Sequence, residues 1–105
     1  MIARLWKTEI DADRLEDFQR FANEQSLPMF KQQKGFLGVQ FWHNPEGCVT
    51  LSLWEDMAAI EALKDSETYQ QTVKDIKASG LVRGEQTVEV FAVFGGTLDK
   101  FTLSP

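Results

Sequence analysis

Apolar residues along the chain are spaced either two apart or three to four apart, and these spacings predict the secondary structure. Steps of two predict strands, and steps of three and four predict amphipathic helices. The expected strands are residues 2–9, 36–43, 48–54 and 86–94, and the expected helices begin near residue 11, at 56 and at 66. This order predicts an α+β fold of the ferredoxin-like β-α-β-β-α-β type, an antiparallel sheet with its helices on one face.

Short polar motifs place the ends of these elements. The run Asn-Pro-Glu-Gly at 44–47 predicts a hairpin turn, because Pro presets one turn dihedral and Gly accepts a positive φ. Asp13, with Glu16 three residues later, fits a capping box at the start of the first helix, and Pro28 predicts that this helix bends or restarts at 26–28. Residues with strong end preferences mark the later helices: Asp56 and Ser66 as N-caps, and Gly80 after the last turn.

The expected strands carry large apolar residues on both of their faces. In the second strand Phe36 and Trp42 oppose Leu37, Val39 and Phe41. Helices cover only one face of such a sheet, and a contiguous exposed apolar patch is uncommon on a monomer. We therefore expect a second copy to pack face to face and form a homodimeric α+β barrel. The alternative is a monomer with a few exposed aromatic residues.

Length and charge narrow the class of protein. The 105 residues predict one domain, at 1–95, followed by a tail, at 96–105, whose apolar residues we expect to pack on the domain or on the dimer partner. Sixteen acidic and eleven basic residues give a net charge of −5, which argues against binding to nucleic acid. A single cysteine, no signal peptide pattern and no run long enough for a bilayer predict a cytoplasmic protein without membrane contact.

The sequence lacks the motifs of several common enzyme classes. It contains no G-x-S-x-G, no phosphate-binding P-loop, no G-x-G-x-x-G and no H-E-x-x-H. One His and one Cys on opposite sides of a turn do not make a ligand set, so no metal site is expected. The remaining classes are an enzyme that works without a cofactor and a protein that is not a catalyst.

Two motifs resemble the antibiotic biosynthesis monooxygenase-like domains of the dimeric α+β barrel superfamily. K-G-F-L-G-V at 34–39 is similar to the family's entry to the second strand, and L-S-L-W-E-D-M-A-A-I-E-A-L at 51–63 is similar to its passage from third strand to helix. The resemblance covers about residues 1–94. In the polyketide-oxidising branch it implies oxidation of a small aromatic, quinol-like or polyketide-like molecule by dioxygen, with no metal or organic cofactor.

The resemblance also implies a role for Trp54, which matches a tryptophan at the edge of the family's pocket. The alternative is an ordinary core tryptophan. The haem-degrading branch uses an Asn on the first strand and a His on the helix after that tryptophan, whereas this chain has Trp6 and Lys7 on the strand and no His in 58–69. Haem binding is therefore the less favoured alternative. Further large aromatic residues are candidates for the pocket wall: Trp6, Trp42 and Phe91.

Three polar residues are candidates for catalysis. Arg4 would stabilise a substrate enolate or phenolate if it points inward, or it forms an ion pair with one of the acidic side chains. Tyr69 is a candidate proton donor to a peroxide and also belongs to a packing stripe with Val73 and Ile76. His43 is a candidate general base, or a solvated residue beside the turn. The sequence leaves open a monooxygenase, a non-catalytic dimeric module that binds a small ligand or serves a stress response, and a haem protein.

Overall fold

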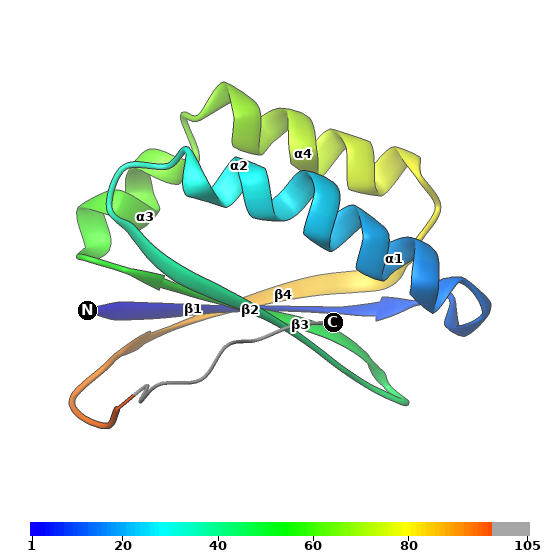
Figure 1. Ribbon diagram of the computed structural model, residues 1–105, viewed down its shortest axis with the longest axis horizontal. Helices are drawn as coiled ribbons and strands as arrows, with labels where there is room; N and C mark the ends of the chain where they lie inside the picture. The colour runs from blue at the N-terminus through cyan, green and yellow to red at the C-terminus, as the bar shows by residue number, and fades with distance from the viewer. Residues whose placement is uncertain (98–105) are drawn as a thin grey trace.

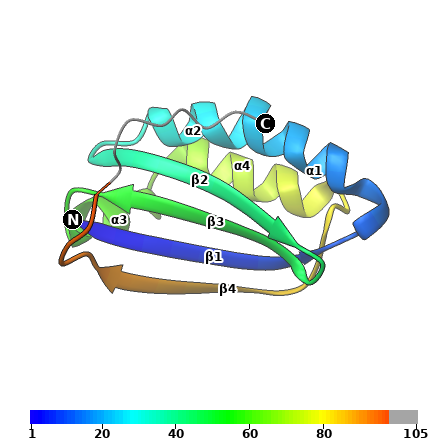
Figure 2. The same ribbon diagram turned by 60° about the horizontal axis from the view of Figure 1, so that its bottom comes forward.

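The computed structural model describes residues 1–97, in which four strands form one antiparallel sheet (Figure 1). The strands are β1 (Ile2–Ile10), β2 (Phe36–Asn44), β3 (Gly47–Trp54) and β4 (Val82–Ala92), in the spatial order β2-β3-β1-β4 (Figure 2). The ferredoxin-like α+β architecture predicted from the sequence is thus confirmed. The last strand begins four residues earlier than predicted and ends two residues earlier. The predicted packing of the tail concerns mainly residues 98–105, which lie outside the described residues.

All helices in residues 1–97 lie on the same side of the sheet (Figure 1). The first helical region consists of a 3₁₀ turn, η1 (Ala12–Arg14), then α1 (Leu15–Phe21), a π turn, η2 (Ala22–Ser26), and α2 (Leu27–Lys31). The second consists of α3 (Met57–Leu63) and α4 (Glu67–Ala78). None of the helices in residues 1–97 combines the length and the apolar character that crossing a membrane requires.

The π turn η2 accommodates Pro28, where the sequence predicted a bend or a restart. A proline in a helix lacks the N–H donor, and its ring collides with the carbonyl four residues earlier. Here the chain winds wider before Pro28, and the N–H of Leu27 bonds to the carbonyl of Ala22, five residues back. The helix therefore runs on through Pro28 and does not restart.

The predicted caps of the later helices are confirmed, and that of the first is wrong. Side-chain oxygens of Asp56 and Ser66 accept the N–H groups of Ala59 and Tyr69, at 2.9 and 3.2 Å. At the first helix the cap is Asp11, whose Oδ1 accepts the N–H of Asp13 at 3.1 Å.

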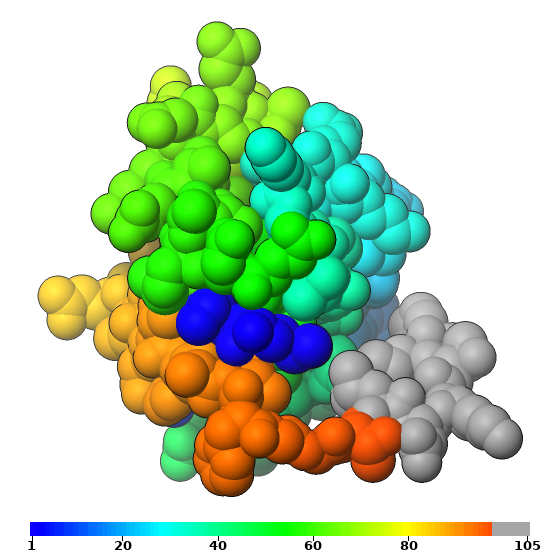
Figure 3. Space-filling model, turned by 90° about the vertical axis from the view of Figure 1, so that its left-hand side faces the viewer, coloured from blue at the N-terminus to red at the C-terminus, as the bar shows by residue number. Residues whose placement is uncertain are grey.

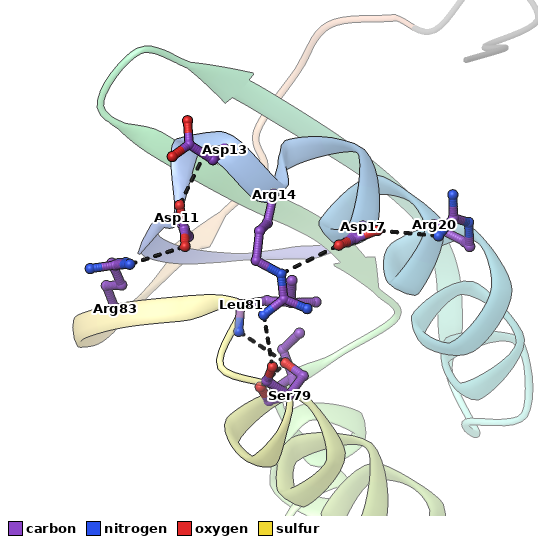
Figure 4. Close-up of polar contacts among 9 residues, drawn as sticks. Asp11, Asp13, Arg14, Asp17, Arg20, Ser79, Leu81 and Arg83 are labelled. Carbon is purple, nitrogen blue, oxygen red and sulfur yellow. Dashed lines mark hydrogen bonds and ion pairs between the residues drawn. The ribbon is translucent and has the colours of Figure 1, made fainter.

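Asp11 also joins the first helix to β4. Arg83 donates to its Oδ2 at 3.0 Å, and nearby Arg14 donates to the carbonyl of Ser79 at 3.1 Å (Figure 4). The start of the first helical region is thereby tied to the end of α4 and to the start of β4.

The face of the sheet under the helices carries two apolar clusters. One contains Phe18, Phe21, Cys48, Ile76 and Leu81. The other contains Met29, Phe30, Trp54, Ile60 and Leu63. The N-terminal residues lie between the region of α3 and the end of β4 (Figure 3), where the N–H of Val93 donates to the carbonyl of Met1 at 3.0 Å.

The opposite face of the sheet carries no helix in residues 1–97 (Figures 1 and 2). Its central strands pair Leu5 with Leu51, and Trp42 and Phe91 near its two edges are 46% and 47% exposed. Large apolar side chains thus stand on both faces, as the sequence predicted. We call this second face the outer face.

The predicted grouping of Phe36 with Trp42 on one face of the second strand is wrong. The register of β2 shifts between Phe36 and Gly38, and this shift places Phe36 with Val39 and Phe41 under the helices.

Candidate functional site

A cavity of about 300 Å³ lies between the sheet and the helices, lined by members of both apolar clusters. Its floor is one row of side chains across the sheet. Trp6 of β1 lies opposite Thr50 of β3 and Val88 of β4, and Thr50 lies opposite Phe41 of β2. All four side chains line the cavity.

The roof of the cavity comes from both helical regions. One face of α4 contributes residues at steps of three, one, three and one, which is the stripe that a helix presents to one side. These residues are Tyr69, Thr72, Val73, Ile76 and Lys77. The first helical region contributes Phe18, Phe21, Ala22, Ser26, Met29 and Phe30. Two of these, Ala22 and Ser26, belong to the π turn, so the widened turn forms part of the wall.

Arg4 and Tyr69 meet at this cavity. Nη2 of Arg4 donates to the hydroxyl of Tyr69 at 2.9 Å, and the guanidinium carbon lies 5.7 Å from the centre of the tyrosine ring, within the range of a cation–π contact. Arg4 is only 8% exposed. Within residues 1–97 it forms no ion pair with a carboxylate, so the alternative of a simple surface ion pair does not hold there.

Hydrogen-bond donors dominate the polar lining. Thr50 is 7% exposed, and within the described part of the chain neither its hydroxyl nor the indole N–H of Trp6 has a hydrogen-bond partner. The Tyr69 hydroxyl accepts from Arg4, which leaves its own proton available. Among residues 1–97, no Asp or Glu lines the cavity. The site can therefore hold an electron-rich oxygen or an anion, and it offers no carboxylate base.

Trp54 lies behind the cavity wall and does not line it. It is fully buried, and its indole N–H donates to the hydroxyl of Ser52 at 2.9 Å. Its ring meets the edges or faces of Phe30 and Phe36, with centroids 6.2 and 5.7 Å away, and Phe30 lines the cavity. Trp54 thus supports a wall residue. Direct contact with a ligand stays a prediction.

The other sequence candidates lie apart from the cavity. His43 is exposed near the hairpin turn, opposite Cys48, and Trp42 and Phe91 are on the outer face, where the Trp42 indole donates to Gln40 at 3.0 Å. Roles for these three in ligand binding or catalysis stay predictions that would need another site.

The described residues form neither an activated thiol nor a metal-binding cluster. Burial raises the pKa of the Cys48 thiol. Residues 1–97 contain no group of three or more His, Cys, Asp or Glu that could hold a metal ion.

The structure brings Arg4, Trp6 and Tyr69 together, and it adds lining residues that the sequence did not single out. Thr50 and Val88 flank Trp6, and Gln86 and Lys77 lie farther along the same cavity. One feature of the sequence could have pointed to Thr50: alternation along the third strand places it on the same side as Trp54. The neighbours of Trp6 across the sheet depend on strand register, which no local pattern in this chain specifies.

A family model described as antibiotic biosynthesis monooxygenase matches residues 1–75. A comparison with curated proteins found no match.

Solved structures share the fold at low sequence identity. A monooxygenase from the gene ActVA-Orf6 of Streptomyces coelicolor, in complex with nanaomycin D, is 14% identical with a TM-score of 0.73, over 94% of this chain and 92% of that one. SnoaB, a cofactor-independent oxygenase from Streptomyces nogalater, is 16% identical with a TM-score of 0.69, over 94% of this chain and 97% of that one. Rv0793 from Mycobacterium tuberculosis is 13% identical with a TM-score of 0.71, over 92% of this chain and 98% of that one.

Proposed function

The chain belongs to the antibiotic biosynthesis monooxygenase family, and from this membership we propose that it oxidises a small aromatic, quinol-like or polyketide-like molecule with dioxygen, without a metal or an organic cofactor. The observation that carries the proposal is the Arg4–Tyr69 pair at the cavity, a buried cation beside a phenol that retains its proton. SnoaB, described as a cofactor-independent oxygenase, and the monooxygenase with bound nanaomycin D support the proposal by their likeness in fold.

The first task of the site is to favour the anion of the substrate. Because the described residues that line the cavity include no Asp or Glu, the substrate binds as its phenolate or enolate, or loses its proton to water on entry. The guanidinium of Arg4 stabilises the oxyanion, and its low exposure strengthens this interaction relative to one in water. Trp6 and Phe41 supply flat walls for the ring.

The oxidation then balances with dioxygen alone. The substrate anion passes one electron to dioxygen, and the resulting radical pair combines to form a carbon–peroxide bond. The hydroxyl of Tyr69 gives a proton to the peroxide. Water then takes the remaining carbon-bound proton, the electron pair of that bond forms the carbonyl, and the oxygen–oxygen bond breaks to release hydroxide, which is protonated to water. One oxygen atom stays as a ring carbonyl, the other leaves as water, and Tyr69 recovers a proton from solvent. For an anthrone-type ring, a methylene and dioxygen become a carbonyl and water.

We also propose that the outer face packs against a second copy of the chain. Leu5 and Leu51 form its centre, and Trp42 and Phe91 are half-exposed on it. Burial of this face in a homodimer would remove a large apolar area from water, which is the main driving force for stable association.

Dioxygen uptake with a panel of reduced quinols and anthrones tests the proposed reaction. Chelator-treated wild type is compared with Arg4→Met and Tyr69→Phe, and with Arg20→Met as a control at an exposed arginine. We expect uptake that chelation does not change, that both cavity variants lose and that the control retains. Uptake that both cavity variants retain would contradict the proposed roles. If no substrate supports uptake and aromatic ligands still bind, non-catalytic ligand binding replaces the monooxygenase.

A further inference from the structure

A second positive charge lies where the cavity opens to solvent. Most lining residues are buried or partly buried, but Lys77 and Val88 are exposed, Val88 to 48%. Since exposed lining residues mark the opening, the mouth lies between the second half of α4 and β4. The loop after α4 leads directly into β4 (Figure 1).

The charge of the lining differs in sign from that of the whole chain. The chain has sixteen acidic and eleven basic residues. In the part of the chain that the structure describes, seventeen residues line the cavity, and they include two cations, Arg4 and Lys77, and no Asp or Glu. Within residues 1–97 neither cation forms an ion pair with a carboxylate. A cavity with two cations and no acid favours a ligand that brings its own negative charge.

The two cations reach the cavity from points well separated along α4. Arg4 is tied to Tyr69 at the start of α4. Lys77 follows Tyr69 by eight residues on the same face of that helix, which is roughly 12 Å along the axis at 1.5 Å per residue. A ligand that satisfies both cations therefore carries two acidic groups at opposite ends of a flat body.

On the basis of the function proposed above, we propose that the substrates are aromatic hydroxy acids, with Lys77 as the residue that recognises their carboxylate. The ionisable ring hydroxyl lies at the inner end against Arg4 and Tyr69. The carboxylate lies at the mouth, where the ammonium of Lys77 donates to it. Lys77 also suits the last turn of α4, where a cation interacts favourably with the helix dipole. Interaction with the helix dipole would not by itself require Lys77 to line the cavity.

Binding of a matched pair of probes by isothermal titration calorimetry tests this assignment. The probes are a hydroxynaphthoic acid with its hydroxyl and carboxyl groups at opposite ends of the ring pair, and the methyl ester of the same acid. We expect wild type to bind the acid about tenfold more tightly than the ester, the size of a charge-assisted hydrogen bond. The preference should disappear in Lys77→Gln and persist in Lys77→Arg.

Lys74→Gln is the matched control, because Lys74 is an exposed lysine of the same helix that does not line the cavity. It should keep the preference for the acid. Equal binding of acid and ester to wild type, binding of neither, or a preference that survives Lys77→Gln would each overturn the assignment. This readout is independent of turnover, so a failure of the monooxygenase proposal would appear as missing dioxygen uptake with the binding preference intact.

Discussion

Arg4 and Tyr69, 65 residues apart in sequence, are joined by a hydrogen bond of 2.9 Å at the wall of the cavity. A buried arginine is ordinarily paired with a carboxylate, because an uncompensated charge away from water costs free energy. Here the bonded partner is a neutral phenol, which offsets only part of that cost. The pair is therefore better suited to binding an anion than to stabilising the fold.

Replacing Tyr69 with Phe should distinguish a role of the hydroxyl in the reaction from a role in stability. Phe retains the ring and its contact with the guanidinium but removes the hydroxyl. We expect kcat for dioxygen uptake to fall by about a hundredfold, a typical contribution of a positioned proton donor, with KM little changed. The free energy of unfolding should change by about 1 kcal/mol, the worth of one hydrogen bond. A rise in KM at unchanged kcat would show that the hydroxyl binds substrate and does not supply the proton.

Replacing Arg4 with Met should abolish anion binding without unfolding the protein. Exchange of a buried charge for an apolar side chain of similar length is often neutral or stabilising. We expect the midpoint of thermal unfolding to stay the same or rise, while affinity for a phenolate ligand falls at least about tenfold. Differential scanning calorimetry and ligand titration on one preparation check both. A large drop in the midpoint would mean that Arg4 is held chiefly for stability.

The fold could be predicted from local residues, because its signals are local. Alternation groups Ile2, Arg4 and Trp6 on one face of β1, although it does not tell which face lies under the helices, and Asp56 and Ser66 are the caps that their chemistry predicts. The cap at Asp11 was missed because the spacing of Asp13 and Glu16 fits a capping box, whereas the oxygen that caps the turn is two residues earlier.

The site was predictable only in part, because it is made of contacts across elements. Arg4 and Tyr69 were candidates by residue type, but their meeting depends on how α4 lies over β1. Trp54 matches a pocket tryptophan by its place at the end of a strand. Its neighbour Ser52, however, takes up its only polar group, and the ring is fully enclosed. The burial of Trp54 depends on how helices and strands pack together, and this packing cannot be predicted from the alternation of residues along one strand.

The enclosure of Trp54 leads to a prediction about stability. Trp54→Ala should lower the free energy of unfolding by about 3–5 kcal/mol, the usual cost of emptying a buried aromatic site. Trp54→Phe should cost less, because most of the ring volume stays and only the N–H bond to Ser52 is lost. Urea titration measures both. If Trp54→Phe changed ligand affinity strongly at unchanged stability, direct contact with the ligand would be supported instead.

The outer face gives a prediction about assembly. Leu51→Glu places a charge at the centre of this face, opposite Leu5, and should convert a dimer to a monomer. Lys74→Glu introduces the same residue on the exposed side of α4 and should leave the assembly unchanged. Size-exclusion chromatography with light scattering distinguishes the two masses. A single-chain mass for wild type at micromolar concentration would refute the dimer.

The contact between Asp11 and Arg83 predicts how stability depends on pH. The hydrogen bond from Arg83, followed by the backbone N–H of Asp13, holds the pKa of Asp11 below its usual value of 3.8. A carboxyl whose pKa is lower in the folded state than in the unfolded state stabilises the fold above the unfolded pKa. This stabilisation is lost as the pH falls through the folded pKa.

Asp11→Asn should therefore be less stable than wild type at neutral pH, and the difference should shrink as the pH falls below about 3.8. Urea titrations at neutral pH and near pH 3 measure the difference in the free energy of unfolding. Arg83→Gln should show the same pH dependence, because it removes the other partner of the same contact. Asp13→Asn, at an exposed carboxylate with no ion pair in residues 1–97, is the control and should show no such trend. A difference between wild type and Asp11→Asn that is equally large at both pH values would mean that the charge of Asp11 does not stabilise the fold, since Asn keeps a capping oxygen.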